Sequence, residues 1–242
     1  MRHMPLRFVF GVYVWGVFFM IALATTLIAA VLPGLARRRR LARACSRAML
    51  RLAGMPVAVR SPERIPEGQC VIVANHASYL DGLVMTAALP PRFGFVIKRE
   101  MSQVPLAGLL LKRLGSQFVE RFHKHRGAAD ARRMMRTAAN GHSLVFFPEG
   151  TFSLRPGLLK FHTGAFVTAA RAGCPVVPAV VRGTRHALAP RARLPRPSRI
   201  EVEFLPPFEV AENAAENATV ELRDRVRNAI LLQLQEPDLS AA

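Results

Sequence analysis

Apolar positions along the chain form one long run and a series of short ones. Residues 8–32 carry no charge, whereas short apolar runs and amphipathic stretches alternate from residue 54 onward. Short apolar runs predict buried strands, and apolar positions three or four residues apart predict helices. The predicted strands cover residues 55–60, 70–74, 93–97, 117–119, 143–147, 176–181 and 199–205, and the predicted helices cover residues 83–89, 105–114, 126–140, 161–172 and 219–234. Strands that alternate with helices indicate an α/β fold, with helices on both faces of a sheet.

The long apolar run of residues 8–32 predicts a membrane helix. A helix of these 25 residues is about 37 Å long and exceeds the roughly 30 Å of a hydrocarbon core. A signal peptide is disfavoured because the run is too long and is followed by the arginines of residues 37–40. Tyr13 and Trp15 could mark an interface, and a Pro-Gly pair follows the run. A full span and a half-inserted helical pair therefore both remain compatible with the sequence.

Residues 36–53 predict a basic amphipathic helix. Arg39, Arg43, Arg47 and Arg51 recur every four residues, a pattern typical of helices that lie on an anionic membrane surface. A solvated charged face is the alternative. Seven arginines follow the apolar run and two precede it, and this bias predicts that the carboxyl side lies in the cytoplasm. We therefore predict a membrane-anchoring segment over residues 1–53, followed by one domain over residues 54–236.

The strong positive charge of the chain implies an anionic partner. The net charge is +18, and residues 1–51 contain nine arginines and no acidic residue. Anionic lipid or a phosphorylated substrate fits better than nucleic acid, because aromatic residues are 7% of the chain and no nucleic-acid-binding motif is present. The three cysteines have neither metal-site nor disulfide-framework spacing, and His123 and His125 have no acidic residue or cysteine nearby. We predict no metal.

The turn after the predicted strand of residues 70–74 holds candidate catalytic residues. His76 and Asp81 are five positions apart, so they can meet if His76 lies in the turn and Asp81 lies in the first turn of the next helix. Ser78 is placed to act as the N-cap, with Asp81 at capping-box spacing. Asp81 would then fix one imidazole nitrogen and leave the other to accept a proton from a substrate hydroxyl. A helix cap beside a structural histidine is the alternative for an isolated pair.

Polar residues also follow other predicted strands, at the edge where parallel strands present their carboxyl ends. Lys98 and Arg121 are cations suited to a phosphate, and arginine can bind one bidentately. Gly150 permits a close approach of backbone to a ligand. Glu149 would repel phosphate, so its expected role is to hold an arginine or to accept a hydrogen bond from the substrate hydroxyl.

Four segments, in this order, resemble the motifs of the glycerolipid acyltransferases, the family of bacterial 1-acylglycerol-3-phosphate acyltransferases. They are Asn-His-Ala-Ser-Tyr-Leu-Asp at 75–81, Gly-Ser-Gln-Phe-Val-Glu-Arg at 115–121, Phe-Pro-Glu-Gly-Thr-Phe-Ser at 147–153 and Val-Val-Pro-Ala-Val at 176–180. The resemblance implies the fold of that family, a mixed and largely parallel sheet flanked by helices. The chain departs from the family at Phe152, where an arginine often follows Thr151; Arg155 is a candidate replacement.

The resemblance implies an integral or monotopic membrane enzyme, and the arginine bias predicts that its catalytic domain lies on the cytoplasmic face of the inner membrane. It would transfer a fatty acyl group from acyl-carrier protein or coenzyme A to the free hydroxyl of a lysophospholipid, with 1-acylglycerol 3-phosphate as the expected acceptor. His76 would be the general base and Asp81 its orienting partner, and no cofactor is implied. The implied substrate-binding residues are Asn75, Ser78, Lys98, Arg121, Glu149, Gly150 and Thr151.

Two alternatives to that function remain open. The same motifs serve acyltransferases whose acceptor is glycerol 3-phosphate, a lyso-ornithine lipid or a lysophosphoglyceride. A non-catalytic lipid-binding protein at the membrane surface is the second alternative, and the intact His76 and Asp81 argue against it.

Overall fold

The computed structural model describes residues 4–119, 136–138, 140–210 and 215–240. The predicted helix of residues 126–140 lies largely outside these residues. Arg121, His123 and His125 lie outside them as well.

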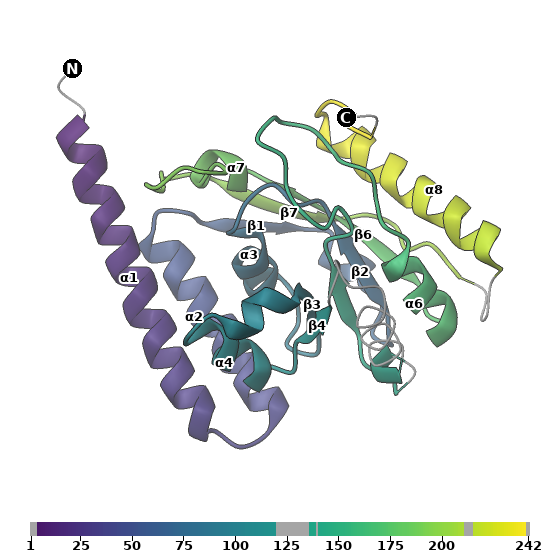
Figure 1. Ribbon diagram of the computed structural model, residues 1–242, viewed down its shortest axis with the longest axis horizontal. Coiled ribbons are helices and arrows are strands. Elements are labelled where there is room, and N and C mark those ends of the chain that lie inside the picture. Colours follow the sequence, from purple (N-terminus) through teal and green to yellow (C-terminus); the bar gives the residue numbers. More distant parts are fainter. Residues whose placement is uncertain (1–3, 120–135, 139, 211–214, 241–242) are drawn as a thin grey trace.

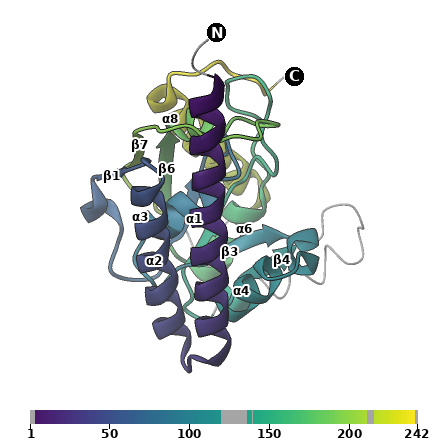
Figure 2. The same cartoon turned by 90° about the vertical axis from the view of Figure 1, so that its left-hand side faces the viewer.

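Two long helices form an antiparallel hairpin along one side of the molecule. Helix α1 (Met4–Val31) and helix α2 (Leu35–Leu52) run side by side and turn at residues 32–34 (Figures 1 and 2). The α1 stretch Leu6–Val31 is long and apolar enough to cross a membrane, judged by length and composition. It also packs on α2 and on helix α4 (Ala107–Arg113). The membrane-helix prediction therefore corresponds to a helix that lies along the domain for much of its length.

Polar side chains of α1 also bind the domain. The Trp15 indole N–H donates to the carbonyl of Arg193 at 2.7 Å, and the Tyr13 hydroxyl donates to the carbonyl of Leu52 at 3.3 Å. Because indole and phenol groups need a polar partner when they are partly covered, these bonds hold the amino-terminal half of α1 against the loop around Arg193 and the end of α2.

The domain is built on a sheet whose described strands run in the order β1-β7-β6-β2-β5-β3-β4. The strands are β1 (Val57–Arg60), β2 (Val71–Ala74), β3 (Gly94–Lys98), β4 (Gln117–Val119), β5 (Leu144–Phe146), β6 (Val176–Arg182) and β7 (Ile200–Phe204). The described pairings are parallel except for the antiparallel pair β6–β7. The mixed, largely parallel sheet predicted from the sequence is thus confirmed.

Helices cover both faces of this sheet, so its central strands are buried on both faces. Helix α3 (Asp81–Ala88) and α2 cover one face, and helices α6 (Gly164–Ala172) and α8 (Glu216–Leu234) cover the other (Figure 1). Alternate residues of β2 divide between the two cores: Ile72 packs with the α2 and α3 side, whereas Val71 packs with α6 and α8. This explains why β2 is apolar without alternation.

Three short helical segments complete the fold. The 3-10 helices η1 (Pro62–Arg64) and η2 (Arg99–Gln103) precede β2 and α4, and the one-turn helix α7 (Thr184–Ala187) follows β6. Helix α7 was not predicted from the sequence. Gly183 makes the turn into it, with φ of +86°, and a Cβ there would lie 2.2 Å from the Arg199 carbonyl oxygen. No larger residue fits that approach without a shift of the backbone.

Most arginines of the basic stripe of α2 bind carbonyls of the domain, and contact of this stripe with a membrane stays a prediction. Arg43 and Arg47 donate to the carbonyls of the last two residues of α3 at 3.4 and 2.8 Å. Arg39 donates to the carbonyl of Leu114, just past α4, at 3.0 Å. Helix carboxyl ends present unsatisfied carbonyls and partial negative charge, which attract cations. Arg51 stays exposed to solvent.

Candidate functional site

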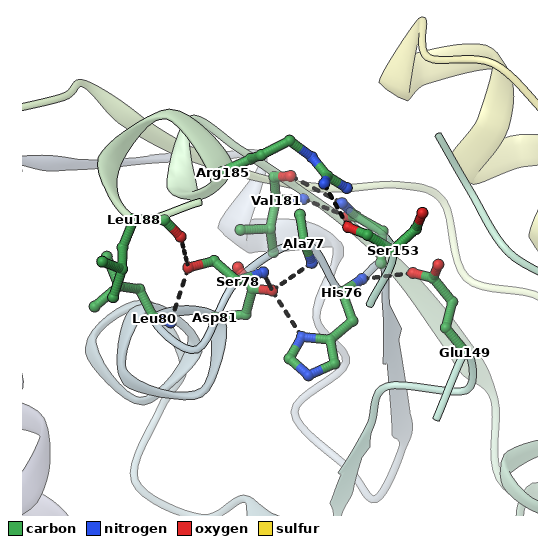
Figure 3. Close-up of polar contacts among 11 residues, drawn as sticks. His76, Ala77, Ser78, Leu80, Asp81, Glu149, Ser153, Val181, Arg185 and Leu188 are labelled. Carbon is green, nitrogen blue, oxygen red and sulfur yellow. Dashed lines mark hydrogen bonds and ion pairs between the residues drawn. The ribbon is translucent and has the colours of Figure 1, made fainter. Parts of the chain in front are cut away.

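The turn after β2 brings His76 and Asp81 together, as their spacing predicted. The Nδ1 atom of His76 lies 2.7 Å from Oδ2 of Asp81, which is the first residue of α3 (Figure 3). Asp81 is fully buried, and the His76 side chain is 20% exposed. A carboxylate of Asp81 accepts a hydrogen bond from Nδ1–H, so the neutral imidazole keeps its lone pair on Nε2. This arrangement can take a proton from a hydroxyl.

The Asp81 carboxylate also organises the backbone of the turn. Its Oδ2 accepts hydrogen bonds from the amides of Ala77 and Ser78 at 2.6 and 2.8 Å. Asp81 is the first residue of α3, so its carboxylate reaches back to amides that precede the N-cap Leu80, and the predicted capping box does not form. Three donors on one oxygen hold the aspartate in a single position, so the imidazole that it binds is held as well.

Ser78 contributes to this turn, but not in the predicted way. The N-cap of α3 is Leu80, and the Ser78 hydroxyl donates to the carbonyl of Leu188 at 2.7 Å while it accepts from the amide of Leu80 at 3.2 Å. The side chain is fully buried. Ser78 therefore ties the turn to the segment after α7, and the structure shows this role in place of the predicted substrate contact.

Asn75 is likewise a structural residue. Its side-chain amide donates to the Val181 carbonyl at 3.0 Å and accepts from the Val181 amide at 2.7 Å. These two bonds continue the β2–β6 ladder one step beyond its last backbone pair, and Asn75 is 3% exposed. An Asn side chain can mimic a peptide group in this way because it carries one acceptor and two donors. The predicted substrate contact of Asn75 is not what the structure shows.

Aromatic rings surround the imidazole. Phe147 stacks on His76 at 4.6 Å between centroids and 27° between planes, and Phe152 meets it edge-on at 4.7 Å and 84°. Tyr79 in turn meets Phe152 edge-on at 4.8 Å and is 73% exposed. Sequence reasoning missed this cage, although the signal was present in the two phenylalanines of the third motif. Phe152 thus places an apolar ring against the base where the family often has an arginine.

Glu149 binds the backbone of His76. Its Oε1 accepts from the backbone amide of His76 at 2.6 Å, and its Oε2 accepts from the amide of Leu159 at 2.9 Å (Figure 3). Burial raises the pKa of Glu149 to about 7, although the two amides and Arg185 lower it. The side chain is 4% exposed. Both oxygens accept from backbone donors, so Glu149 joins two loops; its predicted contact with substrate stays a prediction.

The C-terminal segment holds the loop that Glu149 binds. Residues 157–159 form hydrogen bonds with residues that follow α8. The Gly157 amide donates to Glu236 at 2.6 Å, and the Leu158 amide donates to the Pro237 carbonyl at 2.9 Å. Arg227 of α8, 6% exposed, donates to the carbonyl of Leu159 at 2.9 Å. We call residues 236–239 with Arg227 the C-terminal strap. No sequence pattern pointed to it.

Three further predicted site residues, Lys98, Gly150 and Thr151, lie at the same edge of the sheet. Lys98 ends β3 and forms an ion pair with Glu100 at 3.2 Å. Gly150 has φ of +74°, a conformation that favours glycine, and Thr151 after it is exposed. Arg121 lies outside the described residues. Within the described ranges, no group of three His, Cys, Asp or Glu side chains is placed to hold a metal ion.

Fold and site together place a histidine that could accept a proton, bound to a buried aspartate, at the carboxyl edge of a largely parallel sheet. Residues 56–182 match the model of the Acyltransferase family, which is more than half of the chain. The chain therefore belongs to the acyltransferase family.

Relatives within this family share the fold and part of the sequence. The chain is 32% identical to bovine 1-acyl-sn-glycerol-3-phosphate acyltransferase alpha over 76% of this chain and 65% of that one. It is 29% identical to the Saccharomyces cerevisiae 1-acyl-sn-glycerol-3-phosphate acyltransferase over 79% and 64%. It thus spans about two thirds of the length of these relatives. The crystal structure of the 1-acyl-sn-glycerophosphate acyltransferase PlsC from Thermotoga maritima matches with a TM-score of 0.81 at 20% identity, over 97% of both chains, which shows the shared fold.

Proposed function

We propose that this protein transfers a fatty acyl group from a thioester to the free hydroxyl of a lysophospholipid, and that 1-acylglycerol 3-phosphate is the acceptor and phosphatidate the product. The contact between His76 and Asp81 carries the proposal, because an imidazole held by a carboxylate in this way can accept the proton of a hydroxyl. The names of the relatives supply the acceptor.

The reaction follows from this geometry in two proton movements. His76 Nε2 takes the proton of the acceptor hydroxyl as its oxygen attacks the thioester carbonyl, and Asp81 stabilises the imidazolium that forms. The tetrahedral intermediate then collapses to the ester and expels the thiolate, which takes the proton from His76. The substrate brings the nucleophile, so no covalent acyl-enzyme is needed.

The amides of the turn are already occupied. The His76 amide donates to Glu149, and the amides of Ala77 and Ser78 donate to Asp81. A developing oxyanion needs donors directed at it, so we infer that these donors come from outside residues 76–78.

Cations at the strand ends would bind the acceptor phosphate. We propose Arg121 and Lys98 for this role, with Thr151 and Gly150 at the rim, because they follow strands at the edge where His76 lies. The ring of Phe152 against His76 favours a second candidate, a lysophospholipid with a headgroup on its phosphate, because a phosphodiester carries less negative charge than a phosphomonoester and needs fewer cations. A relative named lysophospholipid acyltransferase LPEAT1 from Arabidopsis thaliana, 38% identical over 48% of this chain, is consistent with this candidate.

We further propose that the helical hairpin attaches the protein to the cytoplasmic face of an anionic inner membrane. Exposed apolar side chains extend along α1 and continue onto the neighbouring segment 101–109, where Met101, Val104, Leu106 and Leu109 are at least 39% exposed. A continuous apolar surface of this kind is typical of a membrane contact. The bias of arginines around α1 gives the orientation.

An acyl-transfer assay on purified protein in detergent tests the activity. Lyso-lipids with different headgroups would be offered with both acyl-carrier protein and coenzyme A thioesters. We expect the fastest transfer to 1-acylglycerol 3-phosphate. Faster transfer to a lysophospholipid with a larger headgroup would favour the second candidate, and no transfer to any acceptor would refute the proposed function.

A further inference from the structure

A pocket of about 460 Å³ lies beyond the carboxyl end of β6, on the side of the base away from β3 and β4. Helix α7 and the loop of residues 189–196 form most of its wall, and Glu236 of the C-terminal strap closes it. Its volume is within the range of small-ligand sites, about 300–1,000 Å³. The proton transfers at His76 do not use this pocket.

The pocket adjoins the loop that covers the base. Arg185, which lines it, donates from Nη1 to the Ser153 carbonyl at 2.7 Å (Figure 3). Ser153 directly follows Phe152, whose ring contacts His76. Arg185 is also close enough to lower the pKa of Glu149. A ligand in the pocket would therefore lie next to the catalytic turn.

The chemistry of the pocket suits an anion. Arg185, His186 and Arg196 line it, and the Nε atom of Arg185 is buried without a hydrogen-bond partner among the described residues. Glu236 is the acidic residue of the lining, and its Oε2 already accepts from the Gly157 amide. Arginine side chains at such a site match a phosphate group.

The pocket is held in shape by contacts on both sides. The close approach of Gly183 to the Arg199 carbonyl fixes the start of α7, and Trp15 of α1 binds the Arg193 carbonyl. The Arg196 amide donates to the carbonyl of Ala187 at 2.8 Å. A pocket that exists before its ligand arrives costs less ordering entropy on binding.

The order of the strands separates this pocket from the proposed acceptor site. His76 follows the central strand β2, Lys98 follows β3 two places to one side, and Arg185 follows β6 on the other side. Acyl transfer joins two substrates at one base. The acceptor carries a phosphate, and so do the thioesters of acyl-carrier protein and coenzyme A. Cations on both sides of the base can therefore hold one phosphate each.

We propose that this pocket binds the phosphate end of the phosphopantetheine arm of the thioester donor. The inference rests on the proposed acyl transfer and adds to it the location of the donor. Coenzyme A and acyl-carrier protein share this arm, so the same cations would serve either source. The thioester would then reach His76 past Ser153 and Phe152.

Variants of the two arginines test the proposal in steady-state assays with three donors: acyl-coenzyme A, acyl-carrier protein thioester and acyl-pantetheine, which lacks the phosphate. We expect Arg196→Gln to raise the donor KM roughly tenfold for donors that carry phosphate, since a charge-assisted hydrogen bond contributes about 1.5–3 kcal/mol. The KM for acyl-pantetheine and for the acceptor should stay unchanged. Arg185→Lys should act in the same direction. Arg193→Gln, on the same loop but outside the lining, is the matched control.

The outcomes separate this inference from the proposed function. If the wild type is active but Arg196→Gln and Arg185→Lys leave the donor KM unchanged, the pocket does not bind the donor. If the variants raise the KM for acyl-pantetheine as much as the KM for the phosphate-bearing donors, the effect is structural. If they raise the acceptor KM, the pocket binds the acceptor. Either result overturns the inference. If the donor KM rises for acyl-coenzyme A alone, the pocket binds the nucleotide phosphates of coenzyme A, and the assignment to the shared arm is overturned. If the wild type transfers no acyl group from any donor, the proposed function itself fails.

Discussion

Glu149 and His76 are joined through the backbone: Oε1 of Glu149 accepts the amide hydrogen of His76 at 2.6 Å. The side chain of His76 is meanwhile held by Asp81. The base is thus fixed at two points, its backbone by the third motif and its imidazole by the first. The other oxygen of Glu149 binds Leu159, which the C-terminal strap holds. A chain of contacts therefore runs from Arg227 to the catalytic turn.

Removal of the base should abolish most of the activity. His76→Ala should lower kcat by about two to four orders of magnitude, the usual contribution of general-base catalysis. Asp81→Asn should also lower it, because the amide cannot stabilise the imidazolium and does not fix the same tautomer. Acyl-transfer rates of purified variants measure both effects. Near-normal turnover of folded His76→Ala would exclude the proposed mechanism.

Glu149 should make stability depend on pH. Its pKa is raised from 4.5 to about 7, so the folded chain holds this proton more tightly than the unfolded chain. Its contribution is therefore present below about pH 4.5 and is lost as pH rises to about 7. The loss should be on the order of 3 kcal/mol, at 1.36 kcal/mol for each pKa unit.

Glu149→Gln removes this titration. The difference in free energy of unfolding, wild type minus variant, should be larger at pH 5 than at pH 8. Denaturant unfolding in detergent at the two pH values measures it. If this difference in free energy of unfolding is equal at pH 5 and pH 8, or larger at pH 8, the raised pKa of Glu149 is contradicted.

Arg227 should affect catalysis although it lies on α8. Arg227→Ala removes donors to the carbonyls of Leu158 and Leu159, so the loop that holds Glu149 should loosen. We expect kcat to fall about tenfold, with little change in either KM, at a temperature well below the melting temperature of the variant. Arg227→Lys should recover part of the loss. Arg223→Ala, which removes an exposed ion pair on the same helix, is the control. If Arg223→Ala lowers kcat as much as Arg227→Ala, Arg227 does not position the catalytic loop.

Arg121 should determine the affinity for a phosphate-bearing acceptor. Arg121→Ala should raise the acceptor KM by roughly one to two orders of magnitude and leave the donor KM nearly unchanged. Arg121→Lys should recover a part, because an ammonium group cannot bind phosphate bidentately. The exposed Arg155 provides the comparison. If Arg155→Ala raises the acceptor KM instead, Arg155 replaces the arginine that is absent at Phe152.

The apolar surface next to α1 should enter the membrane interface. A polarity-sensitive dye on Leu109→Cys should shift to the blue when phosphatidylglycerol vesicles are added, because Leu109 lies on α4 beside α1. The same dye on Leu232→Cys, an exposed leucine of α8, should not respond. A response at Leu232 without one at Leu109 would place the membrane on the opposite side.

Local patterns in the sequence predicted an α/β sheet and a possible contact between His76 and Asp81, and the resemblance of the motifs added the largely parallel sheet and a catalytic role for the pair. The doubly buried run of Val71–Ala74 marked a central strand, and the five-residue spacing of His76 and Asp81 suited a turn into a helix. These features depend on neighbours in the chain, so short-range stereochemistry determines them.

Only the tertiary structure decided what holds that pair in place. Asn75 binds Val181, 106 residues away, and His76 binds Glu149, 73 residues away. Arg43 and Arg47 belong to a stripe with membrane-facing spacing, yet they bind carbonyls at the end of α3 because the fold brings that helix end to them. A side chain that can pair with lipid, phosphate or a carbonyl takes the partner that the packing of distant segments supplies, and sequence spacing does not encode that packing.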